Sequence, residues 1–69
     1  MTHETFRAVA EATFGEHGWI AIVARKNGVH ASTALRWGRG TIPIPETAIT
    51  SLKRDAKARI RELQSLVAA

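Results

Sequence analysis

The chain has 69 residues, so it forms one domain at most, and this size is near the lower limit at which a single hydrophobic core stabilises a fold. Cysteine is absent, which excludes disulfides and thiolate metal sites, and the three histidines have no metal-ligand spacing. Ten Lys and Arg against six Asp and Glu give a formal charge of +4, which favours polyanionic partners such as nucleic acid.

The sequence has no targeting, membrane or catalytic signature. Its start, MTHETFRAVA, lacks the basic and apolar regions of a signal peptide, and the longest apolar run, 19–24, is too short to cross a bilayer. We therefore expect a cytoplasmic protein without a membrane partner. A cysteine nucleophile, a paired-carboxylate motif and a glycine-rich phosphate loop are all missing, so we expect no enzyme, metal, cofactor or small-molecule ligand.

The segment THETFRAVAEATF predicts a first helix. Its apolar residues recur at the helical spacing of three and four, namely at Phe6, Val9, Ala10 and Phe14. Thr2 is a suitable N-cap, and the following GEHG indicates a turn.

The segment WIAIVARKN fits either a strand or a helix. Its β-branched residues are typical of a strand, whereas the small Ala21 and Ala24 and the Asn27–Gly28 stop signal favour a helix, which we predict. The next segment, HASTALRW, predicts a short helix with Ala34 and Trp37 on its inner face. We expect Gly38 and Gly40 to end this helix.

After a TIPIPE loop, a long helix is predicted over about 45–67, with Pro45 in its first turn. A continuous apolar stripe follows its helical period, formed by Ile49, Leu52, Ala56, Ile60, Leu63 and Val67. Helical spacing also predicts two ion pairs, Asp55 with Arg59 and Arg59 with Glu62. At roughly 1.5 Å per residue this helix is about 35 Å long, more than the preceding segments can cover.

The two middle helices have the features of a pair packed at a steep angle. Ala24 allows close approach, Gly28 permits a tight turn, and Val29 and Trp37 pack inward. The outer side of the second of these helices then carries short side chains and one long cation, which suits contact with base edges in the major groove. These residues are His30, Ala31, Ser32, Thr33 and Arg36.

The stretch GVHASTALRWGRGTIPIP resembles the helix-turn-helix core of the Cro and lambda-repressor-like group, also called Xre-type regulators. That group often has Gly-Val-Ser-x-Ser-Thr-Val-x-Arg-Trp-x-x-Gly with a proline shortly after. The matching residues are Gly28, Val29, Ser32, Thr33, Arg36, Trp37 and Gly40, followed by Pro43 or Pro45, and the resemblance covers about 19–52. His30 replaces the usual capping serine, Asn27 a leucine, and Ile20 a glutamine, so whether His30 is a cap, a contact or neither stays open.

The resemblance implies one all-α domain, 1–69, of four to five helices, with the motif over about 19–37. It also implies sequence-specific binding of double-stranded DNA and transcriptional control, as in small phage or mobile-element autorepressors. By position, Ala31, Ser32, Thr33 and Arg36 would face bases, and Arg39 and Thr41 would face phosphates. Arg25 and Lys26 are added as phosphate contacts because of their charge and position.

The end of the last helix predicts a homodimer that binds an inverted-repeat operator. Its apolar residues lie beyond the expected body and would otherwise be exposed, so we assign Ile60, Leu63, Leu66 and Val67 to the interface. The alternative is that this helix folds back and completes a monomeric core.

Two other functions fit the composition. One is a small antitoxin or adaptor that holds a partner protein through the long helix. The other is a membrane-surface helix, because SLKRDAKARIREL is basic and amphipathic, although its apolar face lacks Trp and Phe.

Overall fold

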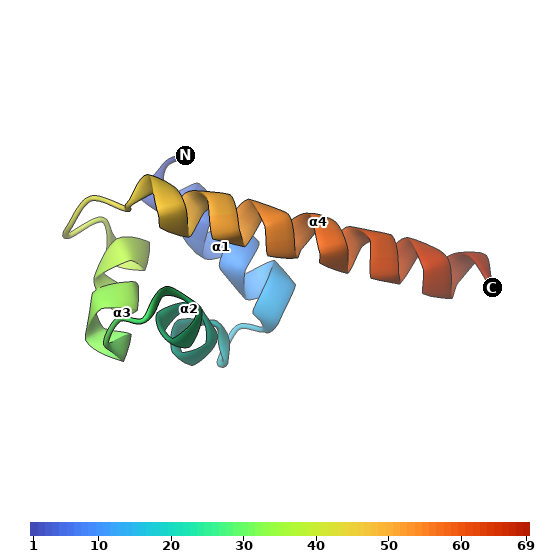
Figure 1. The fold of residues 1–69 in the computed structure, drawn as a ribbon, viewed down its shortest axis with the longest axis horizontal. Coiled ribbons are helices and arrows are strands. Elements are labelled where there is room, and N and C mark those ends of the chain that lie inside the picture. The colour runs from blue at the N-terminus through green and yellow to red at the C-terminus, as the bar shows by residue number, and fades with distance from the viewer.

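Four α-helices joined by short connections make up the computed structural model, which describes residues 1–69. The helices are α1 (His3–Phe14), α2 (Trp19–Asn27), α3 (Ala31–Arg39) and α4 (Glu46–Ala68). The predicted all-α class is confirmed, and the segment that also fitted a strand is helical. The second half of α4 extends away from the other helices, so the molecule is 42 Å long but only 20 × 18 Å across (Figure 1).

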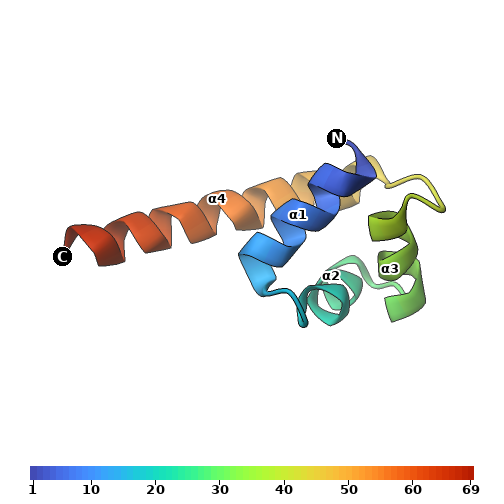
Figure 2. The same ribbon diagram turned by 180° about the vertical axis from the view of Figure 1, so that it is seen from behind.

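The core lies where α1 meets the other three helices. Phe6 on α1 is completely buried, and both tryptophans are only 3% exposed. Figure 2 shows α1 against the first half of α4, with α2 and α3 on the other side of α1. The ten buried apolar residues are Phe6, Ala10, Trp19, Val23, Ala24, Ala34, Trp37, Ala48, Ile49 and Leu52.

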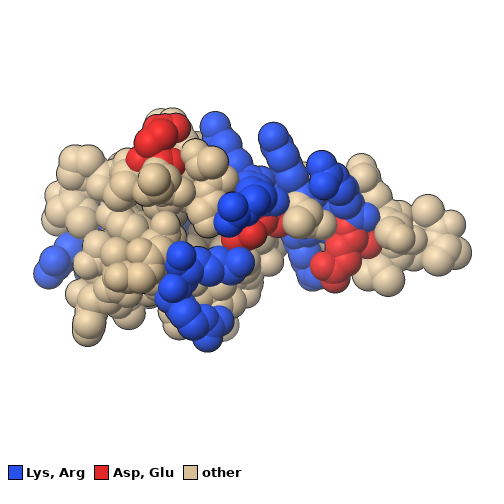
Figure 3. Space-filling view, in the orientation of Figure 1, with Lys and Arg blue, Asp and Glu red and all other residues tan.

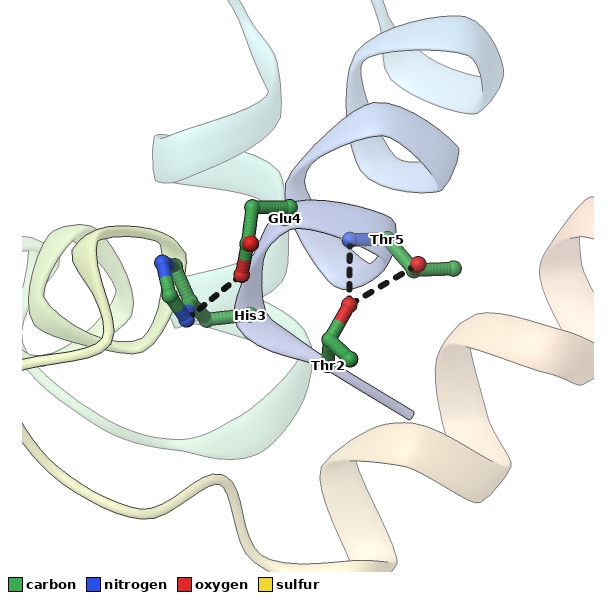
Figure 4. Close-up of polar contacts among 4 residues, drawn as sticks. All are labelled: Thr2, His3, Glu4 and Thr5. Carbon is green, nitrogen blue, oxygen red and sulfur yellow. Dashed lines mark hydrogen bonds and ion pairs between the residues drawn. The ribbon is translucent and has the colours of Figure 1, made fainter.

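The helix ends follow local side-chain and backbone chemistry. Thr2 caps α1, because its Oγ1 accepts a hydrogen bond from the Thr5 backbone N–H at 3.1 Å, as predicted (Figure 4). Pro45 differs slightly from its predicted place: it lies just before α4 with an extended ψ of 146° rather than inside the first turn. Its carbonyl oxygen accepts the Ala48 and Ile49 N–H groups, so it still begins the helix.

Gly38 corrects the prediction that this glycine ends the third helix. It lies inside α3, it is buried, and the helix continues to Arg39 before Gly40 ends it. A Cβ at position 38 would lie 2.6 Å from Cη2 of Trp19, so only glycine allows α3 to approach this indole so closely. A tertiary contact, rather than a helix stop, explains this glycine.

Candidate nucleic-acid interface

Three residues, 28–30, connect α2 to α3 and set the angle between them. Gly28 adopts the left-handed conformation, with φ 63° and ψ 34°. Its N–H bonds to the Arg25 carbonyl at 3.3 Å, and the Val29 N–H bonds to the Ala24 carbonyl at 3.0 Å. These bonds close the end of α2, and the partly buried Val29 packs against the core. The chain therefore enters α3 in one defined direction.

His30 is the N-cap of α3, which answers one question that the sequence left open. Its backbone is extended, and its Nδ1 accepts a hydrogen bond from the Ser32 backbone N–H at 3.3 Å. The Ser32 hydroxyl lies 3.0 Å from the same nitrogen. The imidazole thus takes the capping role that the side-chain oxygen of Ser, Thr, Asp or Asn more often has at a helix N-terminus. The His30 side chain is exposed, so its capping role leaves one edge of the ring facing solvent.

The inner face of α3 is anchored firmly in the core. Ala34, Trp37 and Gly38 are buried. Trp37 meets Phe6 of α1 edge-to-face, with ring centroids 6.4 Å apart and planes at 85°. Gly38 rests on the indole of Trp19 from α2. Since α1 and α2 both hold this face, the opposite face of α3 is presented to solvent on a rigid support.

The residues predicted to contact bases lie on this solvent-facing side, with one exception. His30, Ala31, Ser32 and Arg36 are exposed, whereas Thr33 is partly buried. Arg36 forms no ion pair and no hydrogen bond to another side chain. Its guanidinium therefore keeps all of its donors for a ligand.

The residues predicted to contact phosphates are not equally free. Arg25, Arg39 and Thr41 are exposed and form no side-chain ion pair or hydrogen bond. Lys26 instead points toward α4, where its Nζ lies 3.0 Å from Asp55 Oδ2 and 5.8 Å from the centre of the Phe14 ring. Any role for Lys26 at a phosphate competes with this contact.

Asp55 also corrects one of the two predicted ion pairs. Its side chain is 18% exposed and pairs with Lys26, while Arg54 Nε lies 4.0 Å away, and no pair with Arg59 forms. Arg59 bonds to Glu62 at 2.9 Å, as predicted. The partly buried carboxylate takes the cation that reaches it from α2, because a charge away from water needs a close partner.

Further cations lie along α4. Lys53, Lys57 and Arg61 are exposed and form no ion pair. Figure 3 shows basic side chains gathered over α2 and along the middle of α4, with acidic ones between them on α4. Together with Arg36 and Arg39, these cations spread the positive charge over α2, α3 and the middle of α4, and the last seven residues of the chain carry no charged side chain.

A hollow of mixed charge lies between α1 and the end of α3. It has a volume of about 390 Å³ and is lined by His3, Glu4, Arg7, Ala8, Glu11, Gly38 and Arg39. His3 Nδ1 lies 2.8 Å from Glu4 Oε1 (Figure 4), and Arg7 bonds to Glu11 at 2.8 Å. Both carboxylates thus have partners within α1. No three His, Asp or Glu side chains converge to hold a metal ion.

The residues assigned to a dimer interface lie at the far end of the molecule from α3 (Figure 1). All four, Ile60, Leu63, Leu66 and Val67, are exposed. The first half of α4 packs against α1 and adds Ala48, Ile49 and Leu52 to the core, whereas these four residues of its second half add nothing to it. None of the four helices has the length and apolar composition that crossing a membrane requires.

Comparisons with known proteins identify no relative of this chain. No protein-family model matches the chain, and neither a curated protein nor a solved structure matches it.

Proposed function

We propose that this protein binds double-stranded DNA in a sequence-specific manner and regulates transcription. The observation that carries the proposal is the division of α3 into two faces. Ala34 and Trp37 fix one face in the core, and the other presents Ala31, Ser32 and an unpaired Arg36. Short residues let a helix approach base edges, and arginine bonds to O6 and N7 of guanine.

The arrangement of α2 and α3 supports a helix-turn-helix of the Cro and lambda-repressor-like type. Two short helices joined by three residues that include a glycine fit that motif. In this proposal α3 enters the major groove by its N-terminal end. Arg25, Arg39 and Thr41 contact phosphates on either side, and the exposed cations of α4 strengthen non-specific attraction.

The regulator is proposed to act as a homodimeric repressor on an inverted repeat. Two copies would place two α3 helices on half-sites separated by about 34 Å or a multiple of it. Each half-site supplies few contacts to a recognition helix of 9 residues, so the second copy is needed for affinity.

The test begins with selection of bound duplexes from a random pool, followed by fluorescence anisotropy on the selected and a scrambled duplex. We expect an enriched sequence that binds roughly a thousandfold or more tighter than the scrambled one at physiological salt. Equal, salt-sensitive binding to every duplex would contradict the proposal.

Two arginine variants make the test specific for α3. Arg36→Ala should weaken binding to the selected duplex by about 1–3 kcal/mol and relax selectivity at one base pair. Arg61→Ala removes the same charge from an exposed, unpaired arginine on α4, and should lower affinity for both duplexes to a similar extent. Arg36→Lys keeps the charge but loses the paired hydrogen bonds, so it should resemble Arg36→Ala in selectivity.

A second candidate is a protein-interaction module of the antitoxin or adaptor kind. The exposed apolar end of α4 favours it, because such a patch marks a surface that another protein covers. If the pool yields no enriched sequence and Arg36→Ala changes nothing, this candidate replaces the first.

A further inference from the structure

The free half of α4 exposes a row of large apolar side chains. Exposed fractions are 54% for Ile60, 44% for Leu63, 66% for Leu66 and 84% for Val67. Apart from Met1, these are the only large apolar residues of the chain that are exposed to this degree. They all lie within two turns of one helix, so they form one continuous surface.

An apolar groove adjoins this row. It has a volume of about 320 Å³ and lies between α1 and α4, lined by Val9, Ala12 and Thr13 on one side and Ala56, Ile60 and Leu63 on the other. Arg59 lies at its edge, where it pairs with Glu62. Groove and row share Ile60 and Leu63, so one partner helix would cover both.

We propose that a second copy of this chain occupies the groove, with the two α4 helices antiparallel. The free stripe is Ala56, Ile60, Leu63 and Val67, at spacings of four, three and four, which suits a coiled-coil seam. In one antiparallel register Ile60 lies opposite Leu63 of the second copy, and Ala56 lies opposite Val67. Each pair occurs twice, as a two-fold interface requires.

The shape of the molecule selects the antiparallel direction. Α1 covers the first half of the α4 stripe, where Ile49 and Leu52 are already buried (Figure 2). A parallel partner would bring its own α1–α3 body to the same end of the pair. Antiparallel pairing puts the two bodies, in chains of formal charge +4, at opposite ends and lowers their repulsion.

The residues beside the seam fit the same register. Lys57 would face Gln64 of the second copy, so this cation would meet a neutral side chain. Arg59 faces Leu66, whose exposed side chain the aliphatic part of the arginine would cover. Val67 is large and faces the small Ala56 at the base of the groove, which fills the space between α1 and α4.

This inference depends on α4 and on the α1 side of the groove, and not on DNA binding, so the two proposals are tested separately. Sedimentation equilibrium without DNA should show mass rising with concentration toward twice the 7.5 kDa of the chain. Leu63→Asp should weaken the dimer by roughly tenfold or more, because it would bury a charge. Ala58→Asp adds the same charge to the exposed outer face of α4 and should leave the dimer unchanged.

Three results would overturn the proposal: a wild-type chain that stays monomeric, a Leu63→Asp variant that still dimerises, or an Ala58→Asp variant that dissociates equally. Circular dichroism of both variants checks that the helices remain. Loss of DNA selectivity with an intact dimer would count against the proposed function only.

Engineered cysteines test the direction of pairing, since the natural chain has none. A mixture of Ile60→Cys and Leu63→Cys chains should form a disulfide between unlike chains under mild oxidation. Val67→Cys alone should not, because its two copies would lie about 16 Å apart along the axis, beyond disulfide reach. Efficient cross-linking of Val67→Cys to itself would indicate a parallel pair and refute the register.

Discussion

The left-handed conformation of Gly28 gives a sharp prediction about the connection between α2 and α3. Its φ is 63°, and nothing lies within 4 Å of the place where a Cβ would project. A side chain there meets no steric clash, so the whole effect of substitution is conformational. L-alanine should cost about 1–2 kcal/mol, the penalty of holding an L-residue in this region. In a domain of this size, each 1 kcal/mol lowers the melting temperature by roughly 4–8 °C.

D-alanine at position 28, introduced by chemical synthesis, should have the opposite effect. Its favoured φ is positive and it restricts the unfolded chain, so we expect a gain of about 0.4–1 kcal/mol. Urea unfolding followed by the fluorescence of the two buried tryptophans measures both values, at a concentration where the chain is monomeric. Gly18→Ala is the matched control, because Gly18 has a φ of −103° and its nearest neighbour is at 3.5 Å. Equal losses for L- and D-alanine would refute the reasoning, since they would point to a clash.

Three further changes probe the packing around the site. In Gly38→Ala the new methyl group should displace the Trp19 indole, which lowers the free energy of unfolding by about 1–3 kcal/mol. The higher helix propensity of alanine restores about 1 kcal/mol, so urea unfolding should show a net loss of stability. A variant more stable than the wild type would contradict this. Asp55→Asn removes the charged partner of Lys26 and should cost about 1 kcal/mol, because the lysine side chain is 41% exposed and water replaces part of the lost contact. An equal cost in 1 M salt would show that charge is not the cause. Phe6→Ala leaves a cavity at a completely buried site and should lower the free energy of unfolding by about 3–5 kcal/mol. This is comparable to the whole stability of a small domain, so circular dichroism should show a largely unfolded chain. A folded variant would mean that the edge-to-face contact with Trp37 contributes little.

The helices could be predicted from the sequence because their signals are local. Thr2 acts within one turn of α1, and Gly28 acts on the four residues before it. The local rule that a glycine ends a helix is wrong at Gly38, which lies inside α3. Its reason is Trp19, nineteen positions earlier, and helical periodicity does not reveal which residue will lie under a glycine.

The candidate site shows the same division. Periodicity correctly predicted that Ala34 and Trp37 point inward, so it also placed Ser32 and Arg36 outward. Thr33 is partly buried because it lies at the border between the two faces. His30 could not be assigned, because an imidazole caps a helix only when its ring turns back toward the following N–H, and a sequence does not fix that rotamer.

The sequence predicts a phosphate contact for Lys26 because this lysine follows Arg25 and no acidic residue is near it in the same segment. Its actual neighbour, Asp55, is 29 positions away and comes close only when α4 crosses α2. The locally spaced Arg59 has an acceptor of its own in Glu62, so it does not compete for Asp55. Ion pairs between distant segments are visible only in the tertiary structure, so the sequence alone does not show which cations are free to bind a ligand.

The two halves of α4 differ in burial although their sequence pattern is the same. The apolar stripe has one period throughout, yet Leu52 is buried and Leu63 is not. The difference arises because α1, at 12 residues, is about 18 Å long and α4, at 23 residues, about 35 Å, so α1 covers only one half. The uncovered half adds nothing to the core of one chain, and its apolar side chains are costly to leave in water. A second α4 in the groove would remove that cost from both copies at once, which is why the end of α4 is better explained by an interface than by the fold.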